Sequence, residues 1–263
     1  MKDKSKLRAT FSEDASVAAE DWRLNVVTTL AQPATFQYAH PAGTIVKGIA
    51  QVDRVSGSEL AFGVPNISAL LIDSAQRLFD SGNQYFARLS ADSKKRIEIF
   101  QAEGDLFEAL EARMGCIVFS FTAIEAYANA RIVGAYQQMQ YHYTGKDRSG
   151  QAVQMSLEDI ERNTSIEEKL LTILPQIMGV KLNKGRATWS AFKNLKRIRD
   201  RIIHCKNADL IGNKPGVLTL WHDLASDRFP NAPKDALELI GFFEDGAAES
   251  NRSRWFAKRP RSR

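Results

Sequence analysis

An apolar stripe at helical spacing runs through residues 114–136 and constrains this chain more than any other feature. Successive members of the stripe are separated by four, three, four and four residues. They share one face of an α-helix: Ile117, Phe121, Ile124, Ala128 and Ile132. Because a helix with such a face must bury it against other elements, the stripe predicts the central helix of a helical core.

The same kind of spacing predicts further helices on both sides of this one. Gly104 and Gly115 are expected to break or loosen the pattern that precedes the stripe. The other helices are expected from Pro65, from Ser93, over 165–179, over 189–205 and over 234–243.

Residues 1–62 differ from the rest of the chain. Phe36, Tyr38 and His40 alternate, and the run 44–50 is rich in β-branched residues, which predicts one or two hairpins. The expected fold is therefore mainly α: an up-and-down helical bundle with a small mixed, β-leaning N-terminal extension. Its expected parts are the extension at 1–62, the bundle at 63–250 with a polar surface insertion at 137–163 and a short strand or turn at 217–221, and a basic tail at 251–263.

The net charge of +5 is concentrated in the tail. Residues 252–263 hold six basic residues and no acid, and without them 30 basic residues face 31 acidic ones, a net charge of −1. The body therefore lacks the global basic character of proteins that coat nucleic acid. The tail itself has three interpretations, namely an RNA contact, a dock for an acidic partner, and a frayed terminus. If the tail contacts RNA, its side chains would hold the RNA backbone and stack on a base; these side chains are Arg254, Trp255, Lys258 and Arg259.

Several functional classes lack their motifs in this sequence. No phosphate-binding loop, no nucleophile elbow and no metal-ligand spacing occur, and the four histidines lie far apart. We therefore expect neither a metal nor a cofactor. The first residues are basic without an apolar stretch behind them, and the apolar run at 115–121 is far shorter than the ~20 residues of a membrane span. The expected location is the cytoplasm, with no membrane partner.

The C-terminal end of one expected helix carries residues with catalytic chemistry. Asp200 and His204 are one turn apart and share a polar face with Arg197 and Arg201, whereas Arg199 points about 140° away from His204. A histidine transfers protons near neutral pH, an aspartate can orient its ring, and arginine stabilises the extra charge of a phosphorane. These are the groups that cleavage of an RNA phosphodiester needs. The same residues also fit plain complementation of the helix dipole, without catalysis.

Two segments together resemble a known superfamily. Residues 194–204 (Asn-Leu-Lys-Arg-Ile-Arg-Asp-Arg-Ile-Ile-His) are similar to the Arg-polar-x-x-x-His motif of HEPN domains, and residues 120–129 (Ser-Phe-Thr-Ala-Ile-Glu-Ala-Tyr-Ala-Asn) resemble an early core helix of that superfamily. The resemblance covers roughly residues 65–245. It implies a bundle that is commonly a homodimer.

The resemblance also implies an activity and the residues that carry it. Many HEPN proteins are metal-independent endoribonucleases of toxin–antitoxin or antiphage systems, so RNA and a cognate antitoxin or defence partner are the implied partners. Arg199 would contact the phosphate, Asp200 would be the polar residue of the motif, and His204 would be the acid and base. Glu125 and Asn129 would position the arginine, or would be a surface pair. Other members are non-catalytic modules that bind RNA, a nucleotide or a protein, and helix geometry alone favours Arg201 as the neighbour of His204.

Overall fold

The chain falls into two units in the computed structural model. Unit 1 comprises Met1–Leu70 and Arg252–Arg263, and unit 2 comprises Leu71–Asn251. The expected boundary at 62/63 lies eight residues before this division, and the expected tail belongs with the N-terminal residues. The structure describes residues 8–10, 21–24, 27–29, 34–35, 39–41, 45–53, 59–91, 103–139, 141–146, 149–210, 218–249 and 252–259.

Unit 1 contains a small antiparallel sheet around one long strand, β5 (Ile45–Asp53). The strands β1 (Arg8–Thr10), β2 (Val27–Thr29) and β6 (Glu59–Gly63) all pair with β5, and β3 (Ala34–Thr35) pairs with β4 (Ala39–His40). The β-leaning character expected for this part of the chain is therefore present. Phe36 and Tyr38, which suggested it, lie outside the described residues.

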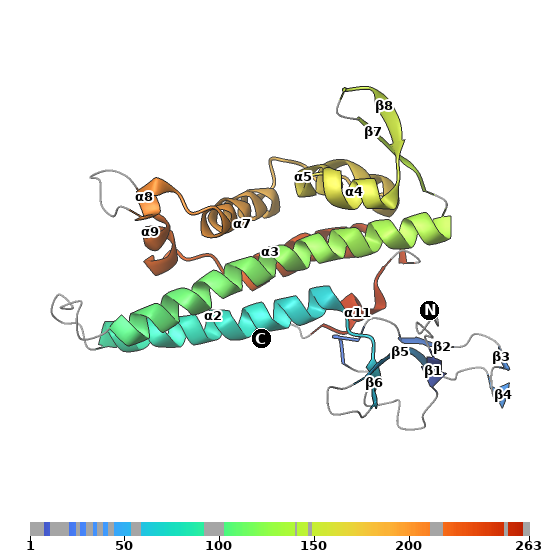
Figure 1. Cartoon of the computed structure of the whole chain (residues 1–263), viewed down its shortest axis with the longest axis horizontal. Helices are drawn as coiled ribbons and strands as arrows, with labels where there is room; N and C mark the ends of the chain where they lie inside the picture. Colours follow the sequence, from blue (N-terminus) through green and yellow to red (C-terminus); the bar gives the residue numbers. More distant parts are fainter. Residues whose placement is uncertain are drawn as a thin grey trace. The chain divides into compact units, whose positions relative to one another are not determined.

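Two long helices dominate unit 2 and lie side by side (Figure 1). They are α2 (Ile67–Ala91), which enters the unit at Leu71, and α3 (Glu103–Met139). The helix expected from Ser93 begins outside the described residues, and from Glu103 onward it is one with the helix expected over 114–136, because α3 is continuous through Gly104 and Gly115. Gly115 lies close to α2, since a Cβ atom there would be 2.8 Å from the end of the Leu78 side chain, Cδ1. A glycine that admits a neighbouring helix need not end its own helix.

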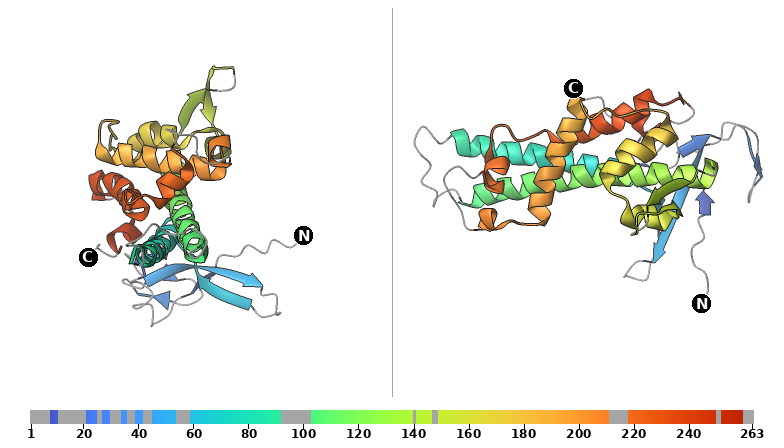
Figure 2. Two further views of the ribbon diagram at one scale, coloured as in Figure 1. Left: turned by 90° about the vertical axis from the view of Figure 1, so that its left-hand side faces the viewer. Right: turned by 90° about the horizontal axis from the view of Figure 1, so that it is seen from above.

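Shorter helices pack on α3 and complete the core of unit 2 (Figure 2). Phe121 of α3 stacks on Phe192 with ring centroids 6.0 Å apart, and Tyr127 Oη donates to buried Glu244 Oε1 at 2.8 Å. The expected mainly α fold is confirmed. The remaining helices are α4 (Leu157–Asn163), α5 (Ile166–Glu168), the π-helix η2 (Lys169–Ile173), α6 (Leu174–Met178), α7 (Ala187–Ile203), α8 (Asn207–Leu210), α9 (Leu220–Ala225) and α10 (Ala232–Gly246).

The region expected to be a polar insertion has regular structure. It forms a hairpin of β7 (Tyr143–Lys146) and β8 (Ala152–Met155), followed by α4. Ser156 caps α4, and Asp159 returns the bond to the Ser156 backbone, which completes a capping box. Tyr143 is buried and its hydroxyl donates to Glu168, the last residue of α5, so this hydrogen bond joins the hairpin to α5.

Of the strand or turn expected at 217–221, the structure describes 218–221, and these residues lead into a helix. Residues 211–217 lie outside the described part, and α9 begins at Leu220. Two groups fix this start. His222 Nδ1 accepts a hydrogen bond from the Thr219 amide, and Asp209 Oδ1 accepts one from the Leu220 amide at 2.6 Å. Tertiary contacts thus override the β-branched and aromatic propensity of the segment.

Within the described part, one helix is long and apolar enough to cross a membrane by length and composition. It is the stretch Gly104–Tyr136 of α3, and 50% of its most apolar window is buried inside the fold. A buried core helix meets the same criterion, and α3 has that position against α7 and α10.

Candidate functional site

The helix α7 presents one buried face and one polar face. Trp189, Phe192, Leu195 and Ile198 are buried at a regular spacing of three residues, and this face lies against α3 and α10. The residues between them are held toward the surface by the same geometry. The polar face therefore has a fixed orientation on a packed core.

Arg199 lies where α7 meets α3. Its guanidinium carbon is 4.6 Å from the centroid of the buried Phe121 ring, Nη1 is 3.0 Å from Asp200 Oδ1, and Nη2 is 3.7 Å from Glu125 Oε2. Its side chain remains 26% exposed. A planar guanidinium placed on a ring and between two carboxylates is restrained in direction while part of it remains in contact with solvent.

Helix geometry suggested that Asp200 could orient the His204 ring, but Asp200 binds other residues. Its Oδ2 accepts a hydrogen bond from Lys196 Nζ at 2.7 Å, and its Oδ1 faces Arg199. Burial alone would raise the pKa of Asp200, but the hydrogen bonds from Lys196 and Arg199 hold it below its usual value. Asp200 is therefore an ionised link between two cations of α7.

His204 ends α7 and is exposed. Its backbone N–H donates to Asp200 O at 2.9 Å, and its φ of −119° and ψ of 67° take the chain out of the helix. Within the described residues, neither a hydrogen bond nor an ion pair restrains the imidazole ring. The ring is thus open to a ligand or to a second chain.

The two other arginines of this segment hold the fold together. Arg201 Nη2 lies 2.5 Å from Asp209 Oδ1 and Nη1 lies 3.0 Å from Asp223 Oδ2, with the Arg201 side chain only 12% exposed. Both Nη atoms of Arg197 donate hydrogen bonds to the same Asp223 carboxylate, at 2.7 and 3.0 Å. These contacts tie α7 to α8 and α9, so the side chain of Arg201 is committed elsewhere and does not act as the neighbour of His204.

Glu125 and Asn129 lie one turn apart on α3, and the structure adds a residue beside them that sequence reasoning missed. Lys169 is buried, and its Nζ donates to Asn129 Oδ1 at 2.9 Å and to Glu161 O at 3.3 Å. Burial raises the pKa of Glu125, and the cations of Arg199 and Lys169 oppose this rise. Glu125 therefore lies between an outer and an inner cation.

The polar face of α7 borders a hollow of about 480 Å³. Its lining carries three cations and one acid from a single helix: Lys193, Asn194, Lys196, Arg197 and Asp200. Charges of opposite sign alternate beside it, since Lys193 Nζ is 2.8 Å and Lys196 Nζ is 4.0 Å from Glu167 Oε1. The hollow is open, and each of its three cations is paired with a carboxylate: Lys193 with Glu167, Lys196 with Asp200 and Arg197 with Asp223.

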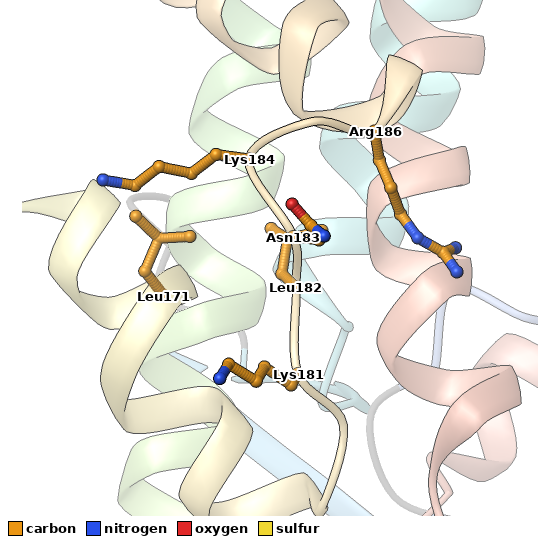
Figure 3. A pocket seen from close by; sticks show the side chains of 6 residues that line it. All are labelled: Leu171, Lys181, Leu182, Asn183, Lys184 and Arg186. Atoms are coloured by element: carbon orange, nitrogen blue, oxygen red, sulfur yellow. The ribbon is translucent and has the colours of Figure 1, made fainter.

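A second hollow, of about 730 Å³, lies at the loop between α6 and α7. Figure 3 shows Lys181 and Lys184 extending toward the side on which Leu171 lies, whereas Arg186 extends to the other side of the loop. The Arg186 guanidinium carbon lies 4.8 Å from the centroid of the Phe242 ring. Among the described residues neither lysine has a carboxylate within ion-pair distance, unlike Lys193 and Lys196.

The tail residues expected to hold RNA have other contacts in unit 1. Trp255, in α11 (Arg254–Ala257), is 9% exposed and its ring centroid lies 5.9 Å from that of Trp22, so it offers no open face to a base. Arg259 packs its guanidinium 3.6 Å from the centroid of the Phe256 ring. Lys258 is exposed, and the Arg254 side chain lies outside the described part.

In the described residues no three His, Cys, Asp or Glu side chains gather where a metal ion could bind. Comparison of the chain with protein-family models, with curated proteins and with solved structures found no match. The geometry around Arg199 and His204 is therefore the ground on which a function can be proposed.

Proposed function

We propose that this chain is a metal-independent endoribonuclease of the HEPN type that acts as a homodimer. The observation that carries the proposal is the arrangement at the end of α7: a restrained, partly exposed Arg199 and an exposed, unrestrained His204, beside a hollow lined by Lys193, Lys196 and Arg197. The carboxylates that pair with these cations hold them by only about 0–1 kcal/mol each at a solvent-exposed site, so the phosphates of a polyanion can take their place.

The chemistry assigns one role to each group. The neutral His204 imidazole takes the proton of an RNA 2′-hydroxyl as its oxygen attacks the adjacent phosphorus. Arg199 donates from its planar fork to the phosphorane, whose charge is larger than that of the starting diester. The bond to the 5′-oxygen then breaks, and this oxygen takes a proton from an imidazolium. The products are a 2′,3′-cyclic phosphate and a 5′-hydroxyl.

A second chain supplies what one chain lacks. The five residues from Arg199 to His204 correspond to about 7.5 Å along the helix axis and about 140° around it, so the two side chains diverge. Two proton-transfer groups are also wanted, one for each oxygen. A two-fold axis beside the end of α7 would bring two copies of both residues to one cleft.

The direct test is cleavage of total RNA by the purified chain in EDTA. Wild type should cut, whereas His204→Ala should lose about 10²- to 10⁴-fold in rate, as expected for a general acid and base. Arg199→Lys should also be impaired, because an ammonium group lacks the two-pronged geometry. His142→Ala, which removes an exposed histidine of unit 2 outside the site, is the matched control and should cut normally. Equal rates for His204→Ala and His142→Ala would exclude the mechanism.

The dimer is tested by mixing chains. If each cleft needs both copies of His204, equal parts of wild type and His204→Ala should retain about a quarter of the activity, since only one dimer in four carries two wild-type chains. Retention of half would mean that each chain acts alone.

One observation favours a second function, a non-catalytic module that binds RNA. Arg199 is already faced by two carboxylates, Glu125 and Asp200, which is common in purely structural networks. In that case, the folded protein would bind RNA stably and wild type would leave it intact in the assay above.

A further inference from the structure

Lys169 is a buried cation without a partner anion in direct contact. It is only 5% exposed, and among the described residues no carboxylate lies within 4.0 Å of its Nζ. Its ammonium group donates hydrogen bonds to two neutral oxygens, Asn129 Oδ1 and the main-chain oxygen of Glu161. Burial lowers its pKa, and Glu125 and Glu161 oppose this effect. Burying an ammonium group is costly, so a lysine at this position calls for an explanation beyond packing.

The local backbone is unusual at the same residue. The Ser165 hydroxyl caps the start of α5 by accepting the Glu168 amide at 3.1 Å, and the chain then passes into the π-helix η2 from Lys169 to Ile173. A π-turn holds one more residue than an α-turn and often lies at functional sites. Three residues of this π-helix are buried, namely Lys169, Leu170 and Ile173.

Glu125 connects this buried cation to the proposed site. Its neighbours of opposite charge are Lys169 from η2 and Arg199 and Lys196 from α7, while Asp200 acts against its ionisation. The Glu125 side chain is part-buried, with Arg199 at its outer side. A carboxylate in this position restrains an arginine only while it is ionised.

We propose that Lys169 is a positioning residue for Arg199: its ammonium group, which donates to Asn129 one helical turn from Glu125, acts through space and without a direct ion pair to keep the Glu125 carboxylate ionised beside the Arg199 guanidinium. The inference rests on the proposed function only for what Arg199 is positioned to do. Lys169 itself touches no substrate, because it lies beneath the surface. Its charge acts on Glu125, and Glu125 acts on Arg199.

The proposal predicts a change at Glu125 when the Lys169 charge is removed. Loss of one of three cations would raise the pKa of Glu125 further, because burial already favours its neutral form and Asp200 remains in place. Glu125 would then become protonated at a higher pH than in wild type. Below that pH, Arg199 would keep Asp200 as its only carboxylate.

The test is a carbon-13 NMR titration of the Glu125 carboxyl group, combined with the nitrogen-15 signal of the Arg199 side chain. Two neutral variants are compared, Lys169→Met and Lys169→Gln, the second of which can still donate to Asn129 and Glu161 O. In both, the Glu125 titration should move to higher pH, and the Arg199 signal should approach that of Glu125→Gln. Lys169→Arg should restore both signals toward wild type.

The matched control is Lys234→Met, which removes an exposed lysine of α10 that does not act on Glu125. It should leave the Glu125 titration unchanged. If the neutral Lys169 variants titrate like this control, or if Arg199 keeps its wild-type signal in them, the proposal is overturned. Lys169→Gln covers the case in which Lys169→Met fails to fold.

Cleavage measurements separate this inference from the proposed function. If wild type cuts RNA, the neutral variants should lose about tenfold to a hundredfold in kcat with little change in KM, and the acid limb of the pH profile should move to higher pH. If wild type does not cut but the NMR shifts appear, the ribonuclease proposal fails and the role of Lys169 stands. If wild type cuts and the NMR shifts are absent, the ribonuclease proposal stands and the role proposed for Lys169 fails.

Discussion

Arg201 provides a sharp test of which arginine on α7 is structural. Its partner Asp209 has a fully buried side chain, with Oδ1 bound by Arg201 and by the Leu220 amide, while Oδ2 has no hydrogen-bond partner among the described residues. Arg201→Ala would leave this carboxylate buried without its cationic partner. Removing one partner of a buried ion pair typically costs about 3–5 kcal/mol.

The effect should depend on pH in a defined direction. Burial alone would raise the pKa of Asp209, but the Leu220 amide and Arg201 hold it below its usual value. A carboxyl whose folded pKa is lowered adds stability above its unfolded pKa of about 3.9, and that stability is lost as the pH falls through the folded value. The gap between wild type and Arg201→Ala should therefore be full at neutral pH and shrink in acid.

Urea denaturation at pH 7 measures the free energy of unfolding directly, and a fall of about 3–5 kcal/mol corresponds to a melting temperature lower by roughly 6–20 °C. Arg199→Ala is the matched control, since its partly exposed ion pairs should contribute only about 0–1 kcal/mol. If Arg201→Ala is as stable as Arg199→Ala, then the assignment of Arg201 to the scaffold is wrong.

Three further predictions follow from local geometry. Burial raises the pKa of Asp235 to about 6, so the folded state loses stability as the pH rises to that value and Asp235 becomes ionised. Asp235→Asn should therefore raise the melting temperature at pH 7.5 and not at pH 4, as measured by calorimetry. Gly115→Ala should change the free energy of unfolding in urea by less than about 1 kcal/mol, because the higher helix propensity of alanine offsets the shift that the new methyl group imposes on the end of the Leu78 side chain. Lys181→Ala with Lys184→Ala should lower the salt dependence of RNA binding by about 0.7 per lost phosphate contact, measured by fluorescence anisotropy.

Helical periodicity was sufficient to predict the core helices of the bundle. The stripe from Ile117 to Ile132 is buried throughout in α3, and the helix expected over 189–205 is present as α7, with Phe192, Leu195 and Ile198 buried. Periodicity did not show that α3 continues through Gly115, because a glycine weakens a helix without having to end it. The spacing of Ser165 and Glu168 is typical of a capping box, and Ser165 does cap α5 by accepting the Glu168 amide, whereas the reciprocal bond is found at Ser156 and Asp159.

The role of Arg201 was harder to predict, because the acids that bind it come from α8 and α9. A helical wheel places Arg201 beside His204, but Asp209 and Asp223 lie 8 and 22 residues further along the chain and take that arginine away. Lys169 gave no signal, because it follows two glutamates at what reads as an exposed helix start. The π-turn shifts the phase of the helix there, and no α-helical pattern encodes that shift.

The most direct measurement of the central proposal is the chemistry of the ends that the wild-type chain leaves on RNA in EDTA, determined by mass spectrometry. Attack by the 2′-hydroxyl, with His204 moving the protons, predicts 2′,3′-cyclic phosphates and 5′-hydroxyls, and predicts that His204→Ala leaves neither. Ends carrying 5′-phosphates, or cyclic ends that persist in His204→Ala, would contradict it.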